Sequence, residues 1–222
     1  MEQRRIICLQ HCSKKVNIFA FDVVPERCPV CAKCLEDEVL HTPPFLLPYP
    51  FRSSNECPCS LVIKPSRGSF LRDYANSTDL HIGVTDSAGK TYEYDSSGLR
   101  VTRGESWTEC LPIFINADRR GPTSTVARPL CPLWKERWDA AIVAVATESH
   151  WTKDRYNTEN HNCFSFVLEF LRCVGVDAWT SCLRDKTSLC SAFILPVTTL
   201  AGKYISLYRQ LLRQNCVMLV SC

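Results

Sequence analysis

The 222-residue sequence lacks the features that would place it at a membrane or in the secretory pathway. Its clearest apolar run, residues 140–146, is far shorter than the roughly 20 residues that a spanning helix needs. The N-terminus has no extended apolar core followed by a small-residue cleavage site, so no secretory signal is expected. We therefore expect an intracellular, cytoplasmic protein with no transmembrane segment.

Strong charge and glycine-rich motifs are missing as well. The 26 basic and 23 acidic residues leave a net charge of +3, which is too mild for electrostatic binding of nucleic acid. The eight glycines are too dispersed to form a phosphate-cradling loop, and no internal repeat or paired-carboxylate pattern stands out. These absences predict no nucleic-acid partner and no organic cofactor.

The most informative segment that is present reads NHNCFSFVL and covers residues 160–168. Apolar residues recur there at helical spacing and predict a helix that ends near Gly175; they are Phe164, Val167, Leu168 and Leu171. Cys163 would lie in the first turn, where unpaired N–H groups and the helix dipole favour a thiolate. A cysteine between aromatic residues is commonly a small buried hydrophobe, so a structural role is the competing interpretation.

Upstream of this helix, residues 80–94 predict a β-hairpin with a turn at 86–89. Alternation places His81 and Gly83 on the same face, with Gly83 leaving open space beside the imidazole. A nucleophilic cysteine needs a base within hydrogen-bond reach. Cys163 at a helix start and His81 on a strand are both available for such a pair, although the sequence does not give the distance between them. His161 is a competing base, which we expect to point outward or to help cap the helix.

These residues carry two resemblances. A His-x-Gly strand followed by a hairpin and a cysteine-bearing helix resembles the circularly permuted papain-like folds of the thiol isopeptidases and the lecithin:retinol acyltransferase-like enzymes. The whole chain more closely resembles the uncharacterised makorin-two opposite-strand protein family. The shared motifs are the N-terminal His-Cys and Cys-Pro-x-Cys, the His-Ile-Gly-Val hairpin, the Asn-His-Asn-Cys-Phe helix and the closing Gly-Lys-Tyr-Ile-Ser-Leu-Tyr.

The distant resemblance implies a cysteine hydrolase or acyltransferase in which Cys163 attacks a carbonyl, His81 acts as the base and a thioester forms. The closer family implies no activity. The chain departs from the distant families after the cysteine, where Phe164 replaces a polar residue, and Glu93 or Asp95 fits the part of a third catalytic residue only loosely. A catalytically inactive papain-like scaffold and an oxidant sensor at Cys163 are the alternatives.

Fifteen cysteines are many for this length, and without a secretory signal they predict reduced thiols or metal ligands. Cys28 and Cys31 have the two-residue gap that lets both sulfurs face one tetrahedral ion. The other half of the site would be Cys12 with either Cys8 or His11. We predict one structural zinc, with Cys8, Cys12, Cys28 and Cys31 as its ligands, because so short a segment cannot bury a core of its own.

The expected fold class is α+β, with a small antiparallel sheet packed on the Cys163 helix in a permuted papain-like domain at residues 60–214. A cysteine-rich zinc-ribbon or knuckle-like module at 1–40 precedes it, joined by a proline- and aromatic-rich connection at 41–59, and a tail follows at 215–222. Further elements are strands at 16–21, 60–65 and 107–115, a helix at 133–148, and a surface loop at 117–129. Two more short elements are expected at 187–195 and 198–212, the second of them with one helical apolar face. A zinc-stabilised interaction protein is the alternative function, and neither substrate nor partner can be named from the sequence.

Overall fold

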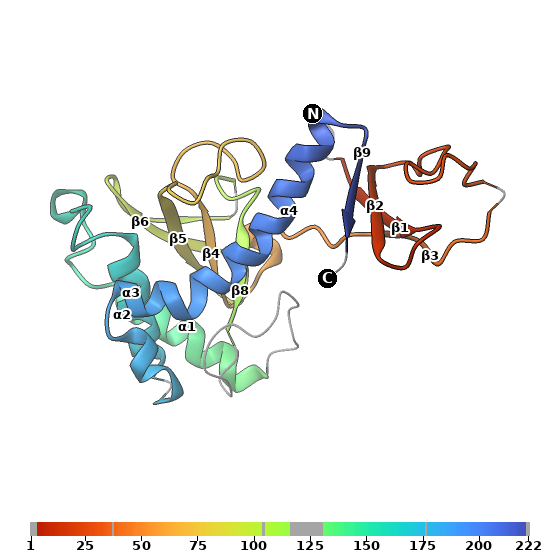
Figure 1. Ribbon diagram of the computed structural model, residues 1–222. Coiled ribbons are helices and arrows are strands. Elements are labelled where there is room, and N and C mark those ends of the chain that lie inside the picture. The colour runs from red at the N-terminus through yellow and green to blue at the C-terminus, as the bar shows by residue number, and fades with distance from the viewer. Residues whose placement is uncertain (1–3, 37, 104, 116–130, 176, 221–222) are drawn as a thin grey trace. The chain divides into compact units, whose positions relative to one another are not determined.

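The computed structural model describes residues 4–36, 38–103, 105–115, 131–175 and 177–220 (Figure 1). The fold is α+β with two antiparallel sheets and a cysteine-rich N-terminal region, which confirms the predicted class. Its contacts divide the chain into two compact units. The N-terminal unit comprises Met1–Tyr49 with Gly202–Cys222, and the larger unit comprises Pro50–Ala201.

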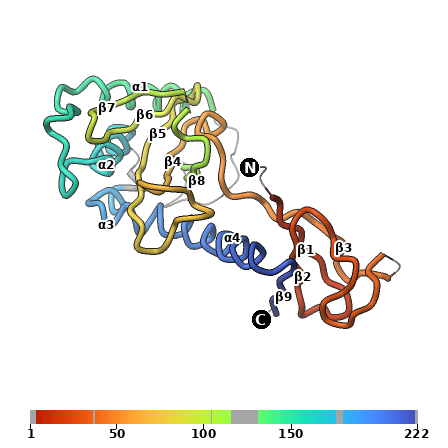
Figure 2. Tube along the Cα trace, turned by 90° about the horizontal axis from the view of Figure 1, so that it is seen from above, coloured from red at the N-terminus to blue at the C-terminus, as the bar shows by residue number. Residues whose placement is uncertain are grey.

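The N-terminal unit contains a four-stranded antiparallel sheet in the order β3-β1-β2-β9. Its strands are β1 (Ile6–Gln10), β2 (Val16–Phe21), β3 (Thr42–Leu46) and β9 (Cys216–Val220). β2 confirms the predicted strand at 16–21. β9 comes from the other end of the chain and pairs with β2 from Val16↔Val220 to Ala20↔Cys216 (Figures 1 and 2). Cys216–Val220 therefore form a strand in this sheet.

β3 is an edge strand, which explains how it accommodates Pro43 and Pro44. Proline has no N–H to donate, so it is tolerated only where one side of a strand is unpaired. The pairing of β3 with β1 is irregular between Cys8 and Gln10. The segment predicted as an extended connection thus begins with a strand.

The core of the N-terminal unit lies around β1, β2 and the loop after β2. Its buried members are Leu9, Ile18, Cys28 and Leu35. The second half of α4 (Leu195–Arg213) belongs to this unit, and its Tyr208 ring meets Phe21 edge-on at a centroid distance of 4.9 Å. Aromatic contact thus fixes this half of the helix to the sheet.

The larger unit contains a five-stranded antiparallel sheet in the order β7-β6-β5-β4-β8. Its strands are β4 (Ser60–Pro65), β5 (Leu80–Thr85), β6 (Thr91–Asp95), β7 (Gly98–Thr102) and β8 (Leu111–Phe114). The predicted hairpin is confirmed as β5 and β6. Asp86 closes its turn by accepting hydrogen bonds from the N–H groups of Ala88 and Lys90, and Gly89 supplies the positive φ of 77°. β7 was not predicted, and β8 is shorter than the predicted strand.

Helices of the larger unit are α1 (Pro132–Ala146), α2 (Cys163–Val174), α3 (Lys186–Leu189) and the first part of α4, with a π-helical turn at Cys190–Ile194. Short 3₁₀ segments lie at Ser54–Glu56, Lys153–Arg155 and Asp177–Leu183. α2 contacts α1 and also β5 and β6. Trp138 of α1 meets Phe170 of α2 at 4.7 Å and donates its indole N–H to the carbonyl of Thr85 at 2.8 Å. Trp138 thus links α1 both to α2 and to the end of β5.

The two short elements predicted at 187–195 and 198–212 form one continuous helix, Lys186–Arg213. By length and composition alone it could cross a membrane, with a mean hydropathy of 1.3 over its most apolar window, 39% of which is buried. Core helices of soluble proteins meet the same criterion, so the absence of a transmembrane segment stays a prediction. The loop predicted at 117–129 lies outside the described residues.

Candidate functional site

Cys163 is the first residue of α2, and Asn162 caps this helix. The Asn162 side chain accepts a hydrogen bond from the N–H of Phe164 at 2.9 Å, and the Asn162 N–H donates to the Ser165 hydroxyl at 3.2 Å. This reciprocal arrangement is a capping box, which fixes the first turn. It places the Cys163 thiol at the positive end of the helix dipole, with the residue only 5% exposed.

His81 and Glu93 come from neighbouring strands of the hairpin. Glu93 on β6 pairs with Gly83 on β5, two residues after His81. Nε2 of His81 lies 3.0 Å from Oε2 of Glu93, and Glu93 is fully buried. Because Glu93 occupies Nε2, the other imidazole nitrogen, Nδ1, remains to serve a different partner.

The second oxygen of Glu93 is held as well. Oε1 accepts a hydrogen bond from the Ser106 hydroxyl at 3.3 Å and lies 3.3 Å from Nη2 of Arg100. Arg100 also forms an ion pair with Asp95. Sequence left Glu93 and Asp95 as weak alternatives for a third residue, and the structure brings Glu93 to the imidazole. Extending the register from Gly83↔Glu93 would place Asp95 opposite His81, so Glu93 reaches the imidazole diagonally across the two strands. Nothing in the sequence indicates Ser106 or Arg100.

His81, Glu93 and Asp95 also carry three ligand atoms that lie within 4.8 Å of one another. Such a group could in principle hold a metal ion. However, the guanidinium of Arg100 pairs with both carboxylates and already supplies their compensating charge.

Neighbouring groups shift the protonation equilibria of this pair. Burial of the imidazole opposes its charge, but hydrogen bonding with Cys163 and Glu93 outweighs burial and raises the pKa of His81 to about 9. Burial likewise opposes ionisation of Glu93, yet His81 and the cations Lys64 and Arg100 lower the pKa of this carboxyl to about 2. Cys163 is therefore close enough to the imidazole to contribute to the raised pKa of His81.

Trp107 covers the imidazole. Its ring stacks on His81 with a centroid distance of 5.5 Å and an interplanar angle of 28°, and Nζ of Lys64 lies 4.3 Å from the Trp107 ring centroid. The expected open space at Gly83 is therefore wrong. A Cβ atom at Gly83 would approach the Trp107 ring to 3.2 Å, so the glycine makes room for tryptophan.

His161 does not point outward as expected. Its ring stacks on Trp151 at a centroid distance of 4.9 Å and an interplanar angle of 5°. Its Nε2 lies 3.2 Å from the carbonyl of His150 and is placed to donate to it. The described contacts thus give His161 a packing role beside the start of α2.

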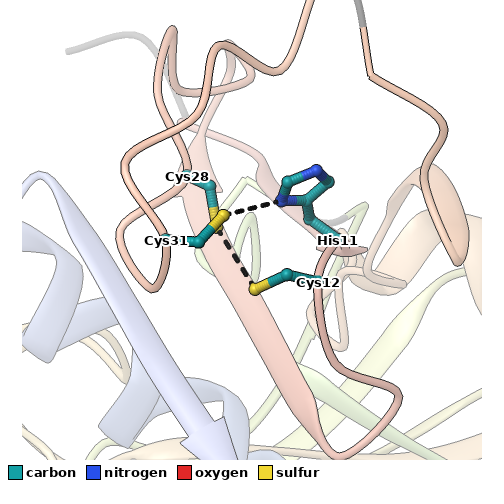
Figure 3. Close-up of side chains that lie close together, drawn as sticks. All are labelled: His11, Cys12, Cys28 and Cys31. Atoms are coloured by element: carbon teal, nitrogen blue, oxygen red, sulfur yellow. Dashed lines mark hydrogen bonds between the residues drawn. The ribbon is translucent and has the colours of Figure 1, made fainter.

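The second group of chemical interest lies in the N-terminal unit. His11 and Cys12 follow the end of β1, and Cys28 and Cys31 lie in a tight turn after β2 (Figure 3). One ligand atom from each residue lies within 4.8 Å of every other. Nδ1 of His11 is 3.4 Å from the sulfur of Cys31, and the sulfurs of Cys12 and Cys28 are 3.9 Å apart. This group could hold a metal ion.

Cys8 was named among the ligands from sequence, with His11 as its alternative. The structure brings His11 into the group and places Cys8 within β1, where it is 4% exposed and pairs with Phe19 and Phe45. Burial raises the pKa of the Cys8 thiol. Cys8 is kept out of the group because the sheet fixes its position inside β1. His11 lies just beyond the end of that strand and joins the group.

The turn that carries Cys28 and Cys31 is closed by its own backbone. The N–H of Ala32 donates to the Cys28 carbonyl at 2.8 Å, and Ala32 adopts a positive φ of 62°. The N–H of Val30 points at the Cys28 sulfur from 3.4 Å. Burial opposes ionisation of this thiol, but backbone N–H groups of Cys31 and Val30 and the nearby His11 lower the pKa of Cys28 to about 6.

Comparison with known proteins identifies the family. Residues 4–35 match the DUF4796 N-terminal family and residues 44–211 match the DUF4796 C-terminal family, so the chain belongs to the DUF4796 family. It is 31% identical to the MKRN2 opposite strand protein of Homo sapiens over 219 residues, which is 99% of this chain and 91% of that protein. The resemblance to the makorin-two opposite-strand family is confirmed. No solved structure matches the chain at a significant level.

Proposed function

We propose that this protein is a cysteine hydrolase or acyltransferase with a permuted papain-like domain. The observation that carries the proposal is the His81 to Glu93 hydrogen bond of 3.0 Å beside a cysteine that opens a capped helix. A nucleophile, a base and a group that orients the base are the components of nucleophilic catalysis. Their order along the chain, with the histidine strand before the cysteine helix, agrees with circular permutation of the papain-like arrangement.

In the proposed mechanism the Cys163 thiolate attacks the carbonyl carbon of an amide or ester, and the carbonyl π electrons move to the oxygen. The tetrahedral intermediate collapses to a thioester as the leaving amine or alcohol takes a proton from the His81 imidazolium. His81, now neutral, accepts a proton from water or from another acceptor that attacks the thioester. The acid or the transferred acyl product leaves, and the cysteine sulfur departs as thiolate to restore the ion pair.

Glu93 is the orienting group in this mechanism. By accepting a hydrogen bond from Nε2–H of His81, it fixes the ring orientation and leaves Nδ1 for Cys163. Its negative charge also favours the imidazolium, consistent with the raised pKa of about 9 for His81. Glu93 is therefore a positioning residue, and it does not exchange a proton with substrate.

Alkylation of Cys163 by iodoacetamide, measured by mass spectrometry as a function of pH, tests the proposal. The tryptic peptide 156–172 contains Cys163 as its single cysteine, so its rate is read without interference. We expect rapid alkylation near pH 7 that falls at least tenfold in His81→Ala. The difference should shrink above about pH 9, because the imidazolium that pairs with the thiolate is then lost.

Two references make this test specific. Cys131, an exposed cysteine that precedes α1, reports the reactivity of a thiol at a helix start within the same sample. His161→Ala should leave the pH profile of Cys163 unchanged. Slow alkylation of Cys163 that ignores the loss of His81, in a variant that is folded by circular dichroism, would show that the pair is not activated.

A non-catalytic, zinc-stabilised interaction protein is the second candidate function. The observation that favours it is the convergence of His11, Cys12, Cys28 and Cys31 in the N-terminal unit. A partner complex that forms equally well with Cys163→Ser and His81→Ala would support this candidate, whereas loss of one activity in both variants at unchanged stability would support the enzyme. For both candidates we propose an intracellular location, because the fourteen cysteines within the described residues are all unpaired.

A further inference from the structure

In the N-terminal unit, the distances between His11, Cys12, Cys28 and Cys31 can be compared with those in a tetrahedral metal site. Two ligands bound at about 2.3 Å to a tetrahedral ion stand about 3.8 Å apart, and a sulfur and a nitrogen ligand stand about 3.6 Å apart. The observed separations are 3.9 Å between the sulfurs of Cys12 and Cys28, and 3.4 Å between the Cys31 sulfur and Nδ1 of His11. Both lie close to what a shared tetrahedral ion requires.

A disulfide does not account for this arrangement. Bonded sulfurs lie about 2.05 Å apart, which is well short of the 3.9 Å between Cys12 and Cys28. Three sulfurs and one imidazole also converge on a common point from two separate segments, with His11 5% exposed and Cys28 1% exposed (Figure 3). A disulfide would also not explain why the buried His11 ring lies beside these sulfurs.

Glu38 lies beside the His11 ring nitrogen that faces away from the cysteines. Its Nε2 lies 3.7 Å from Oε2 of Glu38, and Nζ of Lys33 lies 2.8 Å from the other oxygen of that carboxylate. Histidines that bind metal through one nitrogen typically direct the other toward a carboxylate, which fixes the ring and its tautomer. This places Nδ1, the atom nearest Cys31, as the ligand atom.

We infer that His11 Nδ1 and the sulfurs of Cys12, Cys28 and Cys31 bind one tetrahedral zinc ion, and that Glu38 orients His11 from the opposite side of the ring. The donor set supports zinc, since sulfur-rich tetrahedral sites favour zinc over the harder divalent ions. The ion ties the end of β1 to the turn after β2, and so stabilises a unit with a small core. The inference deepens the second candidate function and does not depend on Cys163.

The test is titration of the metal-stripped full-length chain with Co²⁺, followed by competition with Zn²⁺. We expect one equivalent to give the intense visible absorption of tetrahedral cobalt together with near-ultraviolet charge transfer from three thiolates, and Zn²⁺ to abolish both. His11→Cys should keep one equivalent and raise the charge-transfer intensity by about one third, because a fourth thiolate replaces the imidazole.

Matched variants separate this ligand set from the one expected from sequence. Cys8→Ser should bind cobalt as the wild type does, whereas Cys28→Ser should lose both affinity and one thiolate's share of the charge transfer. Glu38→Gln should retain the spectrum with a 10- to 100-fold weaker affinity, the usual effect of removing such a partner. Glu36→Gln, an exposed carboxylate two residues away, is its control and should bind normally.

Several results would overturn the inference. They are the absence of tetrahedral absorption in a folded wild-type chain, equal loss of binding in Cys8→Ser, the absorption of an iron–sulfur cluster in the purified chain, and a disulfide between Cys12 and Cys28 in non-reducing mass spectrometry. None of these readouts involves the larger unit. Failure here would thus leave the acyl-transfer proposal standing, and failure of Cys163 alkylation would leave the zinc site standing.

Discussion

At the scale of single residues, the buried pair of His81 and Glu93 is the most informative feature of the molecule. A carboxylate that is fully buried is costly unless it is paired and hydrogen-bonded. Three groups satisfy Glu93, namely His81, Arg100 and Ser106. Buried charged groups that shift the pKa of a histidine in this way are common at functional sites, where the protonation state of a side chain matters.

Glu93→Gln should lower the unfolding free energy of the protein and lower the pKa of His81 from about 9 toward its ordinary value of 6.5. Loss of a charged hydrogen bond should cost about 2 kcal/mol of unfolding free energy. The His81 part of this stability is complete below about pH 6.5 and is lost as pH rises through about 9. The Glu93 part is complete above about pH 4.5 and is lost as pH falls toward about 2.

The gap in stability between wild type and Glu93→Gln should therefore be widest between about pH 5 and 6.5 and narrower at pH 9.5. Urea unfolding of wild type and Glu93→Gln at about pH 6 and at about pH 9.5 measures this difference. NMR titration of the His81 ring protons measures the pKa of His81. Asp95→Asn, the same chemical change on the same strand, removes a partly exposed ion pair and should cost less than about 1 kcal/mol. Equal costs for the two variants would contradict a special role for Glu93.

At the scale of elements, the N-terminal turn of α2 sets the position of Cys163. Two asparagines, Asn160 and Asn162, precede Cys163 in the sequence, and Asn162 caps α2 through its side-chain oxygen. Its amide nitrogen also donates to the carbonyl of Thr158 at 2.7 Å, which ties the cap to the preceding loop. Gly175 ends the helix with a φ of 69°, as its position predicted.

Asn162→Ala should lower the unfolding free energy by about 1 kcal/mol, because the first turn of α2 loses its cap. It should also slow alkylation of Cys163, since the thiol is then less firmly held beside the imidazole. Chemical denaturation and the peptide-level alkylation assay measure the two effects. Asn160→Ala, at an exposed position, is the matched control and should change either quantity little; an equal effect there would show that Asn162 is not the operative cap.

At the scale of the whole molecule, the first and last described strands, β1 and β9, belong to one sheet. β9 is the last strand in the sequence, yet it pairs with β2 near the beginning. Val217 of β9 is 5% exposed, and Cys216 packs against the core of the N-terminal unit. β9 therefore contributes to a unit that sequence order alone would assign to the first 40 residues.

A pair of identical substitutions in β9 tests this closure. Val217→Ala should cost about 2 kcal/mol, because it removes buried methyl groups and leaves a cavity. Val220→Ala should cost almost nothing, because Val220 is 71% exposed. Thermal unfolding of the full chain measures both, and equal small shifts would mean that β9 does not pack as described.

The sequence by itself determined the features set by local rules. Alternation and turn chemistry located β5 and β6, helical spacing with a cap and a glycine located α2, and two-residue spacing brought Cys28 and Cys31 to one turn. These signals are local because backbone geometry repeats every two residues in a strand and every 3.6 in a helix. The same rules placed Cys163 and His81 on defined elements without giving the distance between them.

Tertiary structure alone decided the contacts between residues far apart in the chain. A diagonal contact between β5 and β6 brought Glu93 rather than Asp95 to His81, and Trp107 filled the space at Gly83. The end of β1 brought His11 rather than Cys8 to the two downstream cysteines. The pairing of β9 with β2 belongs to the same class. Such contacts depend on how elements pack, because a hydrogen bond or a metal site needs atoms within about 4 Å, and sequence separation does not fix that distance.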